Sequence, residues 1–244
     1  MAKRFYDCAE ARTYSPSGAG NPSGAGNPSG VDFAIYLDDS LLRTPAKAPL
    51  LVPHKGLAEA IAAEWQAQGE EIKPDTMAFM RFAATAIDRI TPDPTPTIKE
   101  FIGFGQTDLL AFRATSPDNL VAKQAALWNP PLAWAAQTYA IVIEPTQTLK
   151  TPAPSEEALA QAATQQPFRL AGLVYGAALL GSAVLTLALA DGFMDASTAF
   201  EAGFLDDIFQ QDYWGQDSEA QARLDKIRLE IETLAVYSAY IREA

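Results

Sequence analysis

Cysteine and histidine are nearly absent: the 244 residues include one of each, Cys8 and His54. A single cysteine excludes an internal disulfide framework and is typical of a reducing compartment, and we interpret Cys8 as a small buried residue. One cysteine and one histidine are too few for a zinc site. No GxSxG motif occurs, and His54 follows a proline, as residues at turns and helix starts do. We therefore expect no metal, no cofactor and no enzymatic activity.

Positive charge is also scarce, with 18 Lys and Arg against 30 Asp and Glu and a formal net charge of −12. So acidic a surface repels phosphate backbones, which disfavours binding to nucleic acid and to anionic membranes. It favours a partner that carries basic patches. The N-terminal sequence MAKRFYDCAE has neither a secretory pattern nor an Arg- and Ser-rich transit pattern, so we expect a cytoplasmic protein of bacterial type.

Phosphate-binding motifs are missing as well. The stretch SGAGNPSGAGNPSG, Ser17 to Gly30, contains a Gly-x-Gly pair, but the next glycine comes too late for the dinucleotide fingerprint and a strand, not a helix, is expected to follow. The P-loop motif GxxxxGK[ST] occurs nowhere in the sequence. Because one six-residue unit is repeated and then begun again, we interpret the stretch as an exposed, dispensable loop that was lengthened by duplication.

Long apolar runs are absent except for one, Leu170–Ala190, which carries no charge. Its length is sufficient to span a bilayer, and Gly172 and Gly176 have the spacing of packed membrane helices. The alternative is a helix that is buried on all sides of a helical domain. Ala and Gly dominate the run and no cluster of positive residues flanks it. We therefore expect a buried helix and no stable membrane insertion.

The N-terminal part is typical of a small β-rich domain with one helix. Short alternating segments separated by turns predict strands, and apolar residues at helical spacing predict a helix after them. The predicted strands are Arg4–Tyr14, Val31–Leu37, Leu41–Thr44 and Pro49–Val52, and the predicted helix is Leu57–Gln68.

From residue 75 onward the pattern is helical. Asp75 is a candidate N-cap for a helix over Thr76–Ile90, and proline signatures predict two consecutive helices between Ser116 and Thr138. Further predictions are a helix over Ile98–Gln106, a short strand over Tyr139–Glu144, a linker over Leu149–Glu157, the apolar helix, and two last helices. The final helix has one buried stripe, formed by Leu224, Ile227, Ile231, Leu234, Ser238 and Ile241.

The predicted fold class is therefore α+β. A β-rich N-terminal domain with a helix, residues 1–74, precedes an all-α helical-bundle C-terminal domain, residues 75–244. Within the second domain the acid-rich stretch Leu205–Glu219 lacks the spacing of a calcium loop, so we interpret it as a docking surface or a solvated face. Trp65 and Trp214 each border charged residues, as anchors of protein interfaces often do.

Several motifs occur together in a familiar order. They are TPAKAPLLVP, LAEAIAAEWQAQGEEIKPDTM, TAIDRI, GQTDLLAFRA and FQQDYWGQD. In this order they resemble the ATP12 family, the assembly chaperones of the F1 part of ATP synthase, and the resemblance covers nearly the whole chain. It implies an ATP-independent chaperone that binds the free F1 α subunit and shields the surface that the β subunit later covers. We expect the protein to be a monomer. Eukaryotic members of the family are mitochondrial matrix proteins.

The resemblance also implies site residues. Trp65 matches the tryptophan of the family's EW-x-x-Q motif, and Thr107 with Asp108 matches its TDLL run. The pattern Q-x-x-x-WG-x-D is matched by Gln210, Trp214, Gly215 and Asp217, and the preceding functional acid corresponds to the pair Asp206 and Asp207. The implied partner-binding residues are Trp65, Asp206, Asp207, Gln210, Trp214 and Asp217. The alternative is a two-domain protein that binds or converts a small molecule, which a deep pocket lined by perturbed carboxylates would support.

Overall fold

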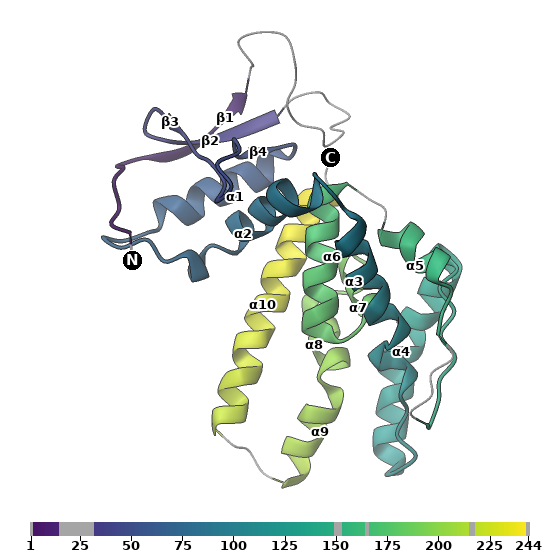
Figure 1. Ribbon diagram of the computed structural model, residues 1–244. Coiled ribbons are helices and arrows are strands. Elements are labelled where there is room, and N and C mark those ends of the chain that lie inside the picture. The colour runs from purple at the N-terminus through teal and green to yellow at the C-terminus, as the bar shows by residue number, and fades with distance from the viewer. Residues whose placement is uncertain (1, 15–31, 149–152, 164–165, 215–217, 243–244) are drawn as a thin grey trace. The chain divides into compact units, whose positions relative to one another are not determined.

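The structure of the chain is a computed structural model that describes residues 2–14, 32–148, 153–163, 166–214 and 218–242 (Figure 1). The repeat between Ser17 and Gly30 lies outside the described residues. Internal contacts divide the chain into two compact units. The first comprises Met1–Thr95, Gln166–Ala171 and Ala239–Ala244, and the second comprises Pro96–Gln165 and Gly172–Ser238.

The first unit contains a small antiparallel sheet with β2 at its centre. The strands are β1 (Ala9–Tyr14), β2 (Asp32–Leu37), β3 (Ser40–Leu41) and β4 (Leu51–Val52). One edge of β2 pairs with β1 over six residues, and the other pairs with β3 and β4. Four strands were predicted here and four are found, although β1 is shorter than its predicted range. Cys8 precedes β1 and is exposed, so the prediction that it is buried was wrong.

Helix α1 (Lys55–Gln66) packs on the sheet through one apolar face. His54 is its N-cap residue and is buried, which confirms the expectation that it starts a helix. The buried face of α1 consists of Leu57, Ala58, Ile61, Ala62 and Trp65. This spacing of three and four residues is the helical periodicity seen in the sequence, and the buried face of α1 forms part of the first unit's core.

A 3-10 turn, η1 (Pro74–Thr76), precedes helix α2 (Ala78–Thr85), which continues into a π-helical turn, η2 (Ala86–Ile90). Asp75 was predicted to be the N-cap of this helix, and that prediction was wrong. The carboxylate of Glu64 in α1 instead accepts hydrogen bonds from the amides of Phe79 and Met80, each at 2.8 Å. A side chain distant in sequence therefore satisfies two of the amides that a helix start leaves unpaired.

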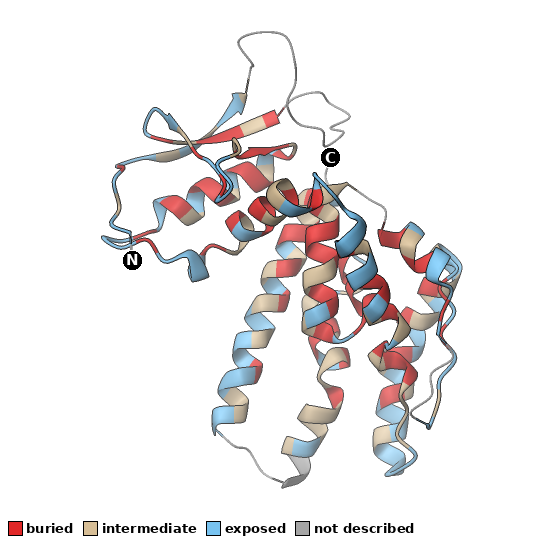
Figure 2. Cartoon of the chain, in the orientation of Figure 1, coloured by how far each residue is buried: buried red, intermediate tan, exposed pale blue. Residues whose placement is uncertain are grey.

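The regular elements described in the second unit are helices, and Figure 2 shows its buried residues gathered where the helices meet. Its elements are α3 (Thr95–Gln106), η3 (Leu109–Ala111), α4 (Asp118–Tyr139), α5 (Glu156–Ala163), α6 (Pro167–Leu180), α7 (Ala183–Ala190), α8 (Ala196–Gly203), α9 (Leu205–Trp214) and α10 (Ser218–Arg242). Every residue of α7 is buried. Helix α7 contacts α4 and α8, so it forms the centre of this core.

Helix α4 is one continuous helix of 22 residues, so the prediction of two helices was wrong. Pro130 and Pro131 lie inside it. Proline removes an amide hydrogen bond but its fixed φ is compatible with a helix. Here Trp128 holds the helix just before the prolines, because its indole Nε1 donates a hydrogen bond of 2.8 Å to the carbonyl of Ala202. Packing therefore outweighs the local signal.

Two other predictions for the second unit were wrong. Residues 141–144 form no strand, because α4 ends in a left-handed turn at Ala140 (φ 56°) and the chain continues without regular pairing. Three helices, α8, α9 and α10, follow the apolar run where two were predicted. The stretch between Asp195 and Trp214 contains two short helices because Asp195 caps α8 and α9 starts anew at Leu205.

The apolar run Leu170–Ala190 forms two helices rather than one. Gly181 adopts a positive φ of 64°, a conformation that glycine reaches without strain. Ser182 then caps α7, its hydroxyl oxygen accepting a hydrogen bond of 3.0 Å from the amide of Leu185. Within the described parts of the chain, every helix is too short or too polar to span a bilayer. The expectation of a buried apolar segment is thus confirmed, and that of a single helix was wrong.

Helix α10 confirms the predicted amphipathic pattern. Leu224, Ile231, Leu234, Ser238 and Ile241 are buried on one stripe as predicted, whereas Ile227 is only partly buried. In the second unit α6 and α10 run side by side (Figure 1), and a Cβ added at Gly176 of α6 would lie 2.7 Å from Leu234 Cδ2. The glycine pair that resembled a membrane motif therefore lets α6 approach the buried face of α10 closely.

The α+β fold class is confirmed: a small antiparallel sheet with a helix comes first, and a helical part follows. The units defined by contacts differ from a simple division of the chain, because the first residues of α6 and the last of α10 belong to the first unit. Separate domains over residues 1–74 and 75–244 stay a prediction.

Candidate partner-binding surface

The predicted site residues fall in both units. Trp65 belongs to α1 of the first unit. Asp206, Asp207, Gln210 and Trp214 share a single helix of the second unit, α9. Asp217 lies outside the described residues. The structure thus brings four of the six residues together on one short helix.

Helix α9 begins where the sequence supplies both an apolar anchor and negative charge. Leu205, its first residue, is buried at 5% exposure. Asp206 and Asp207 then occupy the first turn. Carboxylates at this position interact favourably with the positive end of the helix dipole. The local sequence therefore both stabilises the helix start and places two adjacent carboxylates at it.

Asp206 is held from one side by α4. Its Oδ1 accepts a hydrogen bond of 3.0 Å from Gln124 Nε2. Gln124 is itself 2% exposed, and its Oε1 accepts a hydrogen bond of 2.8 Å from the amide of Ala114. A buried glutamine with both ends of its amide bonded has one fixed orientation. Asp206 is therefore a positioned carboxylate rather than a freely rotating surface group.

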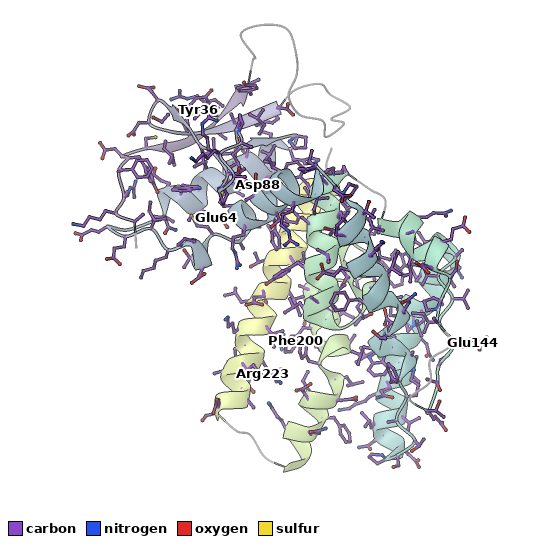
Figure 3. All side chains as sticks on the ribbon, in the orientation of Figure 1. Tyr36, Glu64, Asp88, Glu144, Phe200 and Arg223 are labelled. Carbon is purple, nitrogen blue, oxygen red and sulfur yellow. The ribbon has the colours of Figure 1, made fainter. Side chains whose placement is uncertain are left out.

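Asp207 is held from the other side by α10. Its Oδ1 accepts a hydrogen bond of 2.6 Å from Arg223 Nη2, and both side chains are about half exposed; Figure 3 labels Arg223. An exposed ion pair of this kind contributes only about 0–1 kcal/mol to stability. Its main consequence is that the negative charge of Asp207 is partly offset within the chain.

Half-exposed apolar side chains lie beside these acids. Phe209 is partly exposed, and the Nζ of Lys123 lies 5.6 Å from the centre of its ring. Ile208 is likewise only partly buried, and Gln210 is exposed. We call Asp206, Asp207, Ile208, Phe209 and Gln210 the α9 surface. Acids next to incompletely buried apolar groups are the composition of a releasable protein interface.

Trp65 lies in a different environment. Its side chain is 8% exposed and packs edge to face with Tyr6, with ring centroids 5.7 Å apart. The Tyr6 hydroxyl donates a hydrogen bond of 2.6 Å to the carbonyl of Trp65. Its indole Nε1 is buried and has no hydrogen-bond partner. As the ring is arranged here, it is part of the first unit's core.

The rest of the EW-x-x-Q motif is structural as well. Glu64 caps α2, and burial raises the pKa of its carboxyl while the bonded amides of Met80 and Phe79 lower it. Gln68 Nε2 donates to Thr76 Oγ1 at 3.1 Å, and its Oε1 accepts from the amide of Lys73 at 2.7 Å. The motif therefore joins α1 to the turn that precedes α2.

Asp108 of the TDLL run has the most perturbed carboxyl among the described residues. It is 1% exposed, and its two oxygens accept hydrogen bonds from the amides of Leu110 (3.0 Å) and Val184 (3.1 Å). Burial raises its pKa to about 6. The sequence did not indicate that Asp108 is a buried acceptor for the amide of Val184, because Val184 lies 76 residues further along the chain.

Two hollows in the first unit lie around Gln68–Glu71. The larger, of about 630 Å³, includes Glu64 and Lys73 among its lining residues. Asp108 lines neither hollow. Glu64, whose pKa burial raises, lines the larger hollow, but both of its oxygens already accept backbone amides, which occupies the atoms that an acid or base would use. No group of three or more possible metal ligands occurs in the part of the chain that the structure describes.

Comparison with known proteins gives concordant matches. The model of the family described as ATP12 chaperone protein matches residues 3–136. The solved structure of Atp12 from Paracoccus denitrificans is 32% identical, with a TM-score of 0.83 over 98% of each chain. An aspartate-to-lysine mutant of P. denitrificans Atp12p is 31% identical, also with a TM-score of 0.83, over 98% of this chain and 97% of that one. The Atu1473 protein from Agrobacterium tumefaciens is 34% identical, with a TM-score of 0.81 over 97% and 84%.

Proposed function

The chain belongs to the ATP12 chaperone family, and we propose that it binds the free α subunit of F1 ATP synthase and shields the face of α that the β subunit later covers. Membership confirms the resemblance seen in the sequence and makes the protein a chaperone that acts in the assembly of a protein complex. The identity of the α subunit as the client, and ATP-independent action, belong to the proposal.

The observation that carries the proposal is the α9 surface. Asp206 and Asp207 are held in position by Gln124 and Arg223, and incompletely buried apolar side chains lie next to them. An unassembled subunit exposes an apolar interface that is liable to aggregate. Apolar contacts would cover that interface, while the acids would steer basic groups of the client toward it and keep the complex releasable.

The proposed contact residues are Asp206, Asp207, Gln210 and Trp214 of α9, together with Asp217, which lies outside the described residues and is included from the family resemblance alone. Trp65 was included in the same set, but its ring is 8% exposed and belongs to the core of the first unit. A direct contact through Trp65 requires a rearrangement of that core. The proposal accordingly rests on α9, and Trp65 is assigned the role of supporting the fold.

The first test is co-expression with the F1 α subunit and, separately, with the β subunit, followed by capture on the tagged chain. We expect α to be captured and β not. Capture of β without α would overturn the assignment of the client. Repeating the capture without added nucleotide, and with ATP, tests the ATP-independent action, since the proposal requires equal recovery of α in both.

The second test reverses the two charges, Asp206→Lys with Asp207→Lys. Its matched control reverses Glu156 and Glu157, which are exposed and also lie in the first turn of a helix of the second unit. Both variants change the net charge equally. We expect only the first to lose capture of α at low salt, and equal capture by both would rule out a role for the acids of α9.

A further inference from the structure

An aromatic cluster lies at the C-terminal end of α4. It shares no residue with the α9 surface. The rings of Trp134 and Phe193 stack with centroids 5.1 Å apart and planes 20° apart. Tyr139 meets Trp134 edge to face at 5.6 Å, and its hydroxyl donates a hydrogen bond to the carboxylate of Asp191. We call Trp134, Tyr139, Asp191 and Phe193 the aromatic patch. Phe193 is 45% exposed, so the patch reaches solvent.

The patch is built on two fixed turns. Gly192 adopts φ 74°, and the amide of Phe193 donates a hydrogen bond of 2.9 Å to the carbonyl of Ala188. On the other side, Ala140 in the left-handed region ends α4 directly after Tyr139. An apolar ring that a bonded turn holds in solvent is a preorganised contact group, because little conformational entropy is lost when it binds.

Other aromatic rings of this unit differ from the patch because a cation of the chain lies over each of them. Arg113 lies over Trp128 (5.1 Å), Arg228 over Phe200 (4.1 Å; Phe200 is labelled in Figure 3) and Lys123 over Phe209 (5.6 Å). Among the described residues, no Lys or Arg of the chain lies over Trp134 or Phe193.

The sequence gives the reason. The patch is supplied by the segments 124–149 and 170–222, and neither contains a single Lys or Arg. Both contain acids, among them Glu144, Asp191 and Asp195. A flat aromatic face with a carboxylate two residues away, in segments without positive charge, is complementary to a cation that comes from another molecule.

We propose that the aromatic patch is a docking site for an arginine side chain on an extended segment of a protein partner. The near-parallel stack leaves a flat ring face rather than a cage of several rings. A planar guanidinium stacks on a flat ring face, and its charge is attracted by the carboxylate of Asp191, which also accepts the Tyr139 hydroxyl; a tetrahedral ammonium requires a cage to make equivalent ring contacts. This chemistry selects arginine over lysine and over quaternary ammonium compounds.

The inference is independent of the identity of the client. The α9 surface contacts α4 through Lys123 and Gln124, near the start of that helix. The aromatic patch includes Trp134 and Tyr139, near its end. If the α subunit did not bind, the proposed function would fail, but the proposal for the aromatic patch would not. A titration with peptide tests the aromatic patch directly.

The test is an NMR titration of the full chain with an acetylated and amidated peptide, Gly-Ser-Arg-Ser-Gly, observing the indole N–H signals of the four tryptophans. The matched peptide carries citrulline, which keeps the shape of arginine and lacks its charge. We expect the Trp134 signal to move, and the citrulline peptide to bind about tenfold more weakly, the equivalent of about 1.4 kcal/mol. Tetramethylammonium is the third probe and is expected to bind more weakly than the arginine peptide.

Phe193→Ala removes the exposed ring and is expected to weaken the arginine peptide about tenfold, and Asp191→Asn is expected to weaken it by severalfold. The control is Phe5→Ala, which removes a ring that is 69% exposed in the first unit and should change nothing. Equal binding of the arginine and citrulline peptides to the unaltered chain would overturn the proposal, as would tighter binding of tetramethylammonium. So would equal effects of Phe193→Ala and Phe5→Ala in variants whose spectra show the native fold.

Discussion

The buried carboxylate of Asp108 accepts a hydrogen bond of 3.1 Å from the amide of Val184, 76 residues further along the chain. It thereby caps the start of α7, the helix at the centre of the second unit's core, together with Ser182. A single carboxyl thus links the turn after α3 to the most buried helix of the protein. Its cost is that a charge is held away from water.

This cost predicts how stability depends on pH. Burial raises the pKa of Asp108 to about 6 from its ordinary value of 3.8, so the folded state binds a proton more strongly than the unfolded state between these values. The contribution of Asp108 to the free energy of unfolding therefore decreases as pH rises from 4 to 6, by about 3 kcal/mol at most. In Asp108→Asn this contribution is absent, because the amide does not titrate.

Urea unfolding of both proteins between pH 4 and pH 7.5 measures the effect. The stability of Asp108→Asn relative to the unaltered chain should improve steadily through this range and become constant above pH 7. A difference that stays the same at every pH would show that the carboxyl does not titrate abnormally in the folded state.

His54 predicts a pH dependence of the opposite sign. Burial lowers its pKa, and its Nε2 lies 3.1 Å from Gln166 Nε2 while its ring meets Phe168 edge to face. The folded state then holds the neutral form, so stability is lost as pH falls below the unfolded pKa of about 6.5. His54→Gln should lose less thermal stability than the unaltered chain between pH 7.5 and pH 5.5, and identical losses in the two melting curves would contradict this.

Glu64 predicts a capping energy. Because its carboxylate accepts the amides of Phe79 and Met80, Glu64→Ala should destabilise the first unit by about 1–2 kcal/mol, the usual value for a lost helix cap. The control is Glu59→Ala in the same helix, whose exposed carboxylate meets only Lys55, at 3.4 Å, and which should change stability by about 0.5 kcal/mol or less. Chemical denaturation of both variants gives the comparison, and equal losses would exclude the cap.

The pair Asp207–Arg223 predicts two opposite effects on the proposed client. Arg223→Gln removes the cation that offsets Asp207 and should speed association with the α subunit at low salt, whereas Asp207→Asn should slow it. Both effects should vanish at high salt, because the Debye length shrinks to about 3 Å at 1 M. Stopped-flow association measures them; rate changes of the same sign would show that the acids do not steer, even if α binds.

Gly176 predicts a steric limit between α6 and its neighbours. A Cβ added there would lie 2.5 Å from Thr186 Cγ2 and 2.7 Å from Leu234 Cδ2, so Gly176→Ala should cost about 1–3 kcal/mol of stability. Gly103 in α3 has nothing within 4 Å of such an atom, and Gly103→Ala should stabilise by about 0.5–1 kcal/mol through its higher helix propensity. Thermal unfolding of the pair tests the packing, and a destabilisation shared by both variants would contradict it.

The sequence predicted most of the elements but few of the contacts that join them. Alternation and helical spacing located the strands, α1, α3 and α10, because these elements bury one face and the pattern records it. The wrong predictions occur where a residue distant in sequence determines how a helix begins or continues. Asp75 precedes α2, yet Glu64 caps it; Pro130 and Pro131 suggest a break, yet Trp128 anchors α4 to Ala202 and the helix continues.

The candidate site shows the same limit. The family resemblance singled out Asp206 and Asp207, but the residues that position them, Gln124 and Arg223, come from two other helices. The aromatic patch was not predicted either, because Trp134 and Phe193 are far apart in sequence and neither belongs to a periodic stripe. Only the absence of Lys and Arg from both segments was visible beforehand.

The membership of the first unit has a consequence for how the protein is made. That unit includes Phe168 at the start of α6 and Tyr240 at the end of α10, and Tyr240 lies against Phe79 with ring centroids 6.0 Å apart. A ribosome therefore synthesises every residue of the helical unit before it supplies the residues that complete the sheet-bearing unit. Domains that fold in order of synthesis finish their N-terminal part first, whereas here the earliest part of the chain must wait for the latest.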